Sequence, residues 1–91
     1  MSEEKVFKNF EVAMGESGIS PILYRINDLS EDAVCIIRQN NSYMVINFER
    51  SKYRVQSFQN QHQALVEVIH RIAINEESEK KAIQTFCSLV V

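Results

Sequence analysis

The residue types that most often carry chemistry are few in this chain. His62 and His70 lie eight positions apart on one expected helix, which separates them by about 12 Å along the helix axis and is too far for both to bind one metal ion. The sequence contains no HExxH, CxxC or GxSxG pattern and no glycine-rich phosphate loop. We therefore expect surface histidines, no metal ion and no cofactor.

The clustered acidic residues lie in segments that are expected to form turns. Asp28, Glu31 and Asp32 lie in the segment DLSED, whose residue types favour a turn and whose side chains are expected to be solvated. Glu49 and Arg50 mark the tip of an expected hairpin, where the pKa of a carboxyl is difficult to shift. No residue stands out as a nucleophile or a general base, so we expect a binding protein, which needs only a shaped surface.

The two cysteines, Cys35 and Cys87, both lie in apolar segments. We interpret them as buried thiols of a reducing compartment, and a single disulfide between them is the alternative.

Composition narrows the class of protein further. With 91 residues, 45% hydrophobic and 24% charged, residues 1–91 are expected to form a single domain. The net charge of −2 argues against binding to nucleic acid, which usually requires a basic face. The N-terminal segment MSEEKVFKNF is polar, and no apolar run is long enough to cross a membrane. We expect a cytoplasmic protein without a signal peptide.

The hydrophobic periodicity predicts an α+β fold. A helix is expected over residues 3–15, and two further helices after the capping residues Asn60 and Asn75. Alternating segments predict four strands, joined as an antiparallel meander, with the two C-terminal helices packed on one face of the sheet. The strands are expected at 22–27, 33–39, 42–48 and 53–58. The buried sides are expected to carry Val6, Phe7, Phe10, Ala13 and Met14 in the first helix, Ala64, Leu65, Val68, Ile69 and Ile72 in the second, and Ile83, Phe86, Cys87 and Val90 in the third.

Two-residue turns at Asn40-Asn41 and Arg50-Ser51 set the register of the last three strands. Side chains alternate between the two sides of a sheet, so the register also determines which side chains lie on the same side. We expect one side to face the helices; it carries Cys35, Ile37, Met44, Ile46, Phe48, Tyr53 and Val55. The opposite side is expected to be exposed; it carries Val34, Ile36, Arg38, Tyr43, Val45, Asn47, Arg54 and Gln56. The alternative is that the N-terminal helix covers part of this second side.

The segment YMVINFERSKYRVQSFQNQHQALVEVIHRI, residues 43–72, resembles a region shared by small bacterial immunity proteins of polymorphic-toxin systems, including contact-dependent growth inhibition systems. The resemblance rests on a hydrophobic strand, a tip with Glu and Arg, a second strand that ends in Phe, and an aliphatic helix. It covers about a third of the chain, with Ser51 where the family usually has Gly, and Gln61 and Gln63 in place of acidic residues. The matching residues are Tyr43, Val45, Phe48, Glu49, Arg50, Phe58, Ala64, Leu65 and Ile69.

The resemblance implies a small cytoplasmic protein, not an enzyme, that binds a cognate toxin domain, often a nuclease, and blocks its active site or its access to substrate. It also suggests Phe48 and Phe58 as core residues. The alternative is a homodimeric secretion chaperone or adaptor that pairs through the exposed side of the sheet, and a small enzyme is a more distant third. The protein is expected to be a monomer or a homodimer.

The exposed side of the expected sheet is the predicted partner-binding surface, because Tyr and Arg are frequent at energetic hot spots. The acidic turn is expected to speed association with a basic nuclease surface. The predicted contact residues are Tyr43, Asn47, Arg54 and Gln56 on the sheet, and Asp28, Glu31 and Asp32 in the turn.

Overall fold

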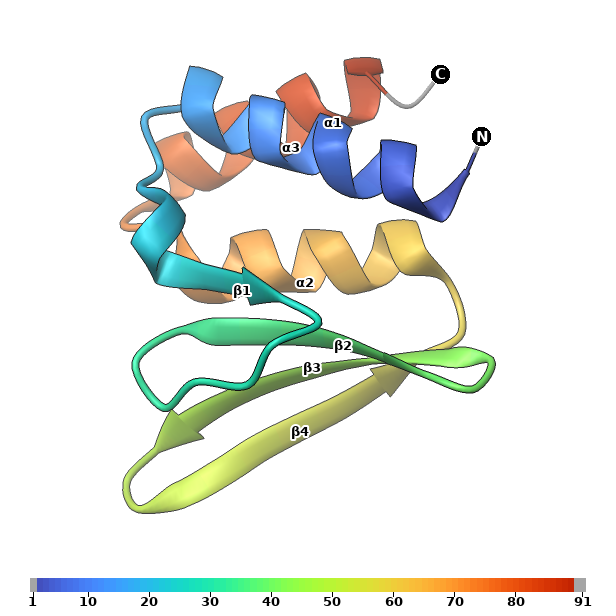
Figure 1. Cartoon of the computed structure of the whole chain (residues 1–91). Helices are drawn as coiled ribbons and strands as arrows, with labels where there is room; N and C mark the ends of the chain where they lie inside the picture. Colours follow the sequence, from blue (N-terminus) through green and yellow to red (C-terminus); the bar gives the residue numbers. More distant parts are fainter. Residues whose placement is uncertain (1, 90–91) are drawn as a thin grey trace.

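The computed structural model describes residues 2–89 of the chain (Figure 1). Within these residues it contains three α-helices, one short 3-10 helix and a four-stranded sheet, so the α+β class predicted from the sequence is confirmed. The elements follow one another as α1 (Glu3–Glu16), η1 (Pro21–Leu23), β1 (Tyr24–Ile26), β2 (Val34–Gln39), β3 (Ser42–Glu49), β4 (Lys52–Phe58), α2 (Gln61–Ile72) and α3 (Glu76–Leu89).

The sheet is mixed, which corrects the prediction of an antiparallel meander. Its strand order is β1-β2-β3-β4, and β1 runs parallel to β2, with Tyr24 opposite Val34. The chain reverses after β1 at Asn27, whose φ is 56° and whose side chain accepts a hydrogen bond from the backbone of Arg38. The loop 27–33 then returns along the sheet before β2 begins. Because β1 has only three residues, this loop is long enough to bring β2 back to the level where β1 starts.

The two hairpin registers were predicted correctly. Cys35 pairs with Ile46 across β2 and β3, and Phe48 pairs with Tyr53 across β3 and β4. The second turn has positive φ at both Arg50 (51°) and Ser51 (66°), the backbone of a tight hairpin turn whose twist matches that of the strands.

The assignment of the two sides of the sheet was wrong. The side that carries Val34, Ile36 and Val45 faces the helices and belongs to the main hydrophobic core. Phe48, expected in the core, lies on the opposite side and is 37% exposed, whereas Phe58 is partly buried against the core as predicted. Both sides of the sheet are apolar, so alternation alone did not decide which side the helices cover.

The helices form two layers above the sheet, as Figure 1 shows. α2 packs directly on β2, β3 and β4, while α1 and α3 pack against each other farther from the sheet. Phe10, fully buried, joins the layers: its ring lies edge-on to Tyr24 at 5.1 Å and to Phe86 at 5.8 Å.

The local predictions for the helices are confirmed in part: Ile72, Ile83 and Cys87, expected to be buried, are only partly buried. All five residues expected on the buried side of the first helix are buried. The side chains of Asn60 and Asn75 accept hydrogen bonds from the backbone of Gln63 and Ser78, which caps α2 and α3. Of the residues expected to be buried in the last helix, Val90 lies outside the described residues. No helix among residues 2–89 is both long and apolar enough to cross a membrane.

Candidate partner-binding surface

One side of the sheet carries apolar side chains and has no helix packed on it. On β3 and β4 it presents Phe48, Tyr53 and Val55, which are 37%, 46% and 51% exposed. The rings of Phe48 and Tyr53 meet at 5.0 Å with an interplanar angle of 65°. Met44 and Ile37, on β3 and β2, are half-buried on the same side. We call the side formed by Ile37, Met44, Ile46, Phe48, Tyr53 and Val55 the open face.

The loop 27–33 covers the part of this side that lies over β2. The backbone amide of Ser30 donates to Sγ of Cys35 over 3.2 Å, and Cys35 is fully buried. Both cysteines are free thiols, as interpreted from the sequence, although Cys87 is only partly buried. The open face is therefore bounded by this loop on one side and ends at the free edge of β4 on the other.

The sheet residues predicted to contact a partner lie on the side that faces α2. Arg71, near the end of α2, donates to Oδ1 of Asn47 over 2.8 Å and to Oε1 of Gln56 over 3.2 Å. It also donates to the backbone carbonyls of Val45 and Arg54, at 3.2 and 3.4 Å. The amides of Asn47 and Gln56 therefore hold α2 on the sheet, and the premise that they point away from the helices was wrong. Their contact with a partner remains a prediction.

Arg71 itself was missed by the sequence analysis. Its side chain is only 3% exposed and pairs with Glu67, one helical turn earlier, at 2.9 Å. A buried guanidinium needs several acceptors to compensate for its lost hydration, and here a carboxylate, two amides and two carbonyls supply them. The available signal was the Glu67–Arg71 spacing of four residues beside the apolar stripe of the helix.

Tyr43 and Arg38 lie near the start of α1. Arg38 forms an ion pair with Glu3, and Tyr43 packs against the core. Burial raises the pKa of the Tyr43 phenol, and the Glu3 carboxylate beside it adds to the shift. The alternative considered for this side of the sheet, a contact with the N-terminal helix, is thus correct for these two residues, while α2 covers most of it.

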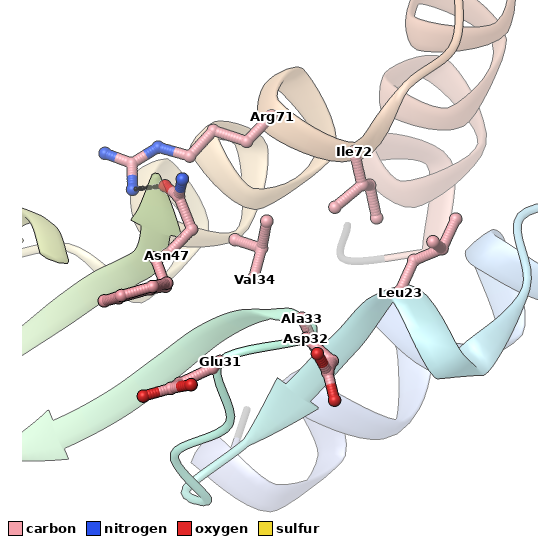
Figure 2. Close-up of a pocket in the computed structure, with 9 residues that line it drawn as sticks. Leu23, Glu31, Asp32, Ala33, Val34, Asn47, Arg71 and Ile72 are labelled. Carbon is pink, nitrogen blue, oxygen red and sulfur yellow. Dashed lines mark hydrogen bonds between the residues drawn. The ribbon is translucent and has the colours of Figure 1, made fainter. Parts of the chain in front are cut away.

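A pocket of about 270 Å³ opens between α2 and the start of β2 (Figure 2). Leu23, Val34 and Ile72 form its apolar wall, and Arg71 with Asn47 lies at one end. Glu31 and Asp32, two of the three acidic residues predicted to contact a partner, also line it. The lining thus carries both signs of charge, and the Arg71 guanidinium is already paired with Glu67 and Asn47.

The third acidic residue lies elsewhere. Asp28 forms an exposed ion pair with Arg25 at 3.3 Å, and it lines a separate hollow beside Tyr24 and Glu11. The structure thus brings Glu31, Asp32 and Asn47 together in one pocket and separates Asp28 from them.

The two histidines occupy different environments. His70 is exposed and lies 2.5 Å from Glu79. His62 is partly buried: its ring stacks on Phe86 with centroids 4.8 Å apart, and Nε2 lies 3.5 Å from Sγ of Cys87. The prediction of two surface histidines is therefore right for His70 alone. Among residues 2–89, no three or more His, Cys, Asp or Glu side chains are grouped so that they could hold a metal ion.

Comparisons with protein-family models, curated proteins and solved structures identified no match to this chain.

Proposed function

We propose that this protein is an immunity protein, which binds a cognate bacterial toxin domain through the open face and blocks its active site or its access to substrate. The observation that carries the proposal is the open face itself. It places Phe48, Tyr53 and Val55, substantially exposed, on the side of the sheet opposite the one on which α2 packs. Exposed aromatic and aliphatic groups held rigidly on strands lose little conformational entropy on binding, which favours tight association.

The charge next to the open face supports a basic partner. The loop that borders it carries Glu31 and Asp32, both exposed, and the net charge of the chain is −2. A nuclease domain has a basic substrate-binding surface, so acidic groups beside an apolar face would speed its approach. The proposal keeps Asp28, Glu31 and Asp32 as steering residues and moves the main contact from Tyr43, Asn47, Arg54 and Gln56 to the opposite side of the sheet.

A homodimeric chaperone or adaptor is the second candidate. The observation that favours it is β4, a fully extended strand at the edge of the sheet with Lys52 to Ser57 all exposed. Such an edge allows two chains to pair without using the open face.

The test is to search the neighbouring genes for a toxin-like domain, to co-express that domain with this chain, and to measure binding of the purified pair by calorimetry. Phe48→Ala with Tyr53→Ala should weaken binding by about 2 kcal/mol or more, which is roughly 30-fold in Kd. The matched control is Ile22→Ala with Ile74→Ala, which removes two exposed apolar side chains away from the open face. This control should bind like the wild type.

Thermal melting separates loss of binding from loss of folding. If the Phe48/Tyr53 variant melts as a folded protein and still binds like the wild type, the open face is not the docking surface. If the neighbouring domain does not bind the wild-type chain at all, the immunity proposal fails.

A further inference from the structure

β4 is one of the two edges of the sheet (Figure 1) and has seven residues, Lys52–Phe58. The opposite edge, β1, has three residues, too few to offer a long row of unpaired backbone groups. Edge strands of several residues tend to pair with another strand unless the sequence protects them.

The β3–β4 register shows which backbone groups of β4 are unpaired. Glu49 and Lys52 flank a two-residue turn and form the first pair of the ladder. Hydrogen-bonded pairs then alternate with non-bonded pairs along an antiparallel ladder. Lys52, Arg54, Gln56 and Phe58 therefore bond toward β3. The amides and carbonyls of Tyr53, Val55 and Ser57 point away from the sheet.

β4 lacks two of the usual protections of an edge strand. It contains no proline, and its register with β3 runs without a bulge from Glu49–Lys52 to Tyr43–Phe58. Its charged residues are Lys52, at the turn, and Arg54, whose side chain lies on the side of the sheet that faces α2. On the open face it presents Tyr53, Val55 and Ser57, none of which is charged. Edge strands that have a regular register and no charged side chain on one side of the sheet pair readily with one another.

We propose that two copies of this chain associate by antiparallel pairing of β4 with β4, with Val55 on the two-fold axis. Two β4 strands form backbone hydrogen bonds only in registers that place Tyr53, Val55 and Ser57 opposite one another, because the backbone groups of these residues point away from β3. Centred on Val55, the pairing sets Tyr53 opposite Ser57 of the other copy, and Arg54 opposite Gln56. It uses the strand from Lys52 to Phe58 in full.

Charge excludes two of the neighbouring registers. A register centred on Arg54 places the two arginines opposite each other, and one centred on Tyr53 places Arg54 opposite Lys52. Like charges directly opposite one another destabilise a strand pair. A register centred on Gln56 avoids this repulsion but leaves Lys52 and Tyr53 without partners in β4. Val55 is the centre that places no two cations directly opposite one another and keeps the whole strand paired.

The dimer would have one continuous eight-stranded sheet. The two-fold axis of an antiparallel pair is perpendicular to the sheet, so the open faces of both copies lie on the same side and all helices lie on the other. Pairing at the edge leaves Phe48 and Met44 accessible, so a toxin domain can bind each copy.

The test uses a charge exchange at the axis. In the proposed dimer, Val55 of one copy lies opposite Val55 of the other. Val55→Lys alone and Val55→Glu alone therefore each place like charges opposite one another and should raise the dimer dissociation constant about 10-fold or more. An equimolar mixture of the two variants should restore a dimer, as a heterodimer. The control pair, Val12→Lys and Val12→Glu, changes a valine of α1 that is 48% exposed and should dimerise like the wild type. Sedimentation equilibrium measures the association in each case.

Hydrogen exchange gives a readout that needs no variant. In the wild type, the amides of Tyr53, Val55 and Ser57 should exchange more slowly as protein concentration rises, while exposed amides outside β4 do not change. Three results would overturn the inference: a wild-type chain that stays monomeric at about 1 mM, single-charge variants that dimerise like the wild type, or a mixture of them that stays monomeric. None of these results depends on whether a toxin binds.

Discussion

Nη1 of Arg71 donates to Oδ1 of Asn47 over 2.8 Å, which joins the last turn of α2 to the C-terminal half of β3. The same guanidinium reaches Gln56 on β4 and Glu67 on its own helix. This group of side chains fixes the position of the helix over β3 and β4.

Arg71→Met should lower the free energy of unfolding by about 3 kcal/mol, because it leaves Glu67 without its partner at a largely buried position. Adding Glu67→Met to this variant should recover part of the loss by removing the unpaired carboxylate. Arg25→Met is the control, since Arg25 forms an ion pair that is exposed, and it should change stability by no more than about 0.5 kcal/mol. Urea unfolding measures all three variants. An equal effect at Arg71 and Arg25 would contradict the role given to Arg71.

Two neighbouring isoleucines test which side of the sheet is covered. Ile36 is 1% exposed in the core under α2, whereas Ile37 is half-buried on the open face. Ile36→Ala should cost about 2–5 kcal/mol through lost burial and the cavity that remains. Ile37→Ala should cost about 1 kcal/mol. The comparison needs only two urea midpoints, and a larger loss at Ile37 would show that the sides are reversed.

Ser51→Gly should raise the free energy of unfolding by about 0.5–1 kcal/mol. Ser51 has a φ of 66°, a conformation that glycine adopts without the steric cost that a side chain imposes. Ser57→Gly, in the interior of β4, is the matched control and should destabilise by a similar amount, because there glycine only adds freedom to the unfolded chain. Melting temperatures that change in the same direction for both variants would contradict the positive φ at Ser51.

Stability should fall at alkaline pH because of Tyr24. Burial raises the pKa of its phenol above the ordinary value, and Glu11 adds to the shift. As the pH rises, the Tyr24 phenol therefore ionises in the unfolded chain before it ionises in the folded protein. The stability that its neutral form contributes is fully present below about pH 10 and decreases as the pH rises further. Tyr24→Phe keeps the ring against Phe10 and should make this decline shallower.

Urea unfolding between about pH 9 and 11 measures the slope for both proteins. The pKa of Tyr43 is raised as well, so the double variant Tyr24→Phe, Tyr43→Phe should show the flattest profile. A slope that is identical in the wild type and in both variants would contradict the assignment.

The sequence by itself determined the local features of this protein. The apolar residues of α1, the caps at Asn60 and Asn75, and the registers Cys35–Ile46 and Phe48–Tyr53 all follow from spacing over a few residues. A helical period, a capping side chain and a two-residue turn each depend on near neighbours in the chain. These features can therefore be inferred before the fold is known.

The tertiary structure decided which side of the sheet is covered, the direction of β1 and the environment of Arg71. Alternation divides strand residues into two sets, but both sets here are apolar, so it does not say which set meets a helix. That choice depends on α2, whose Arg71 needs the oxygens of Asn47 and Gln56. β1 likewise depends on a loop that folds back over Cys35. Contacts between residues far apart in sequence set these features, because only the assembled layers show which polar groups lose their water and must find partners.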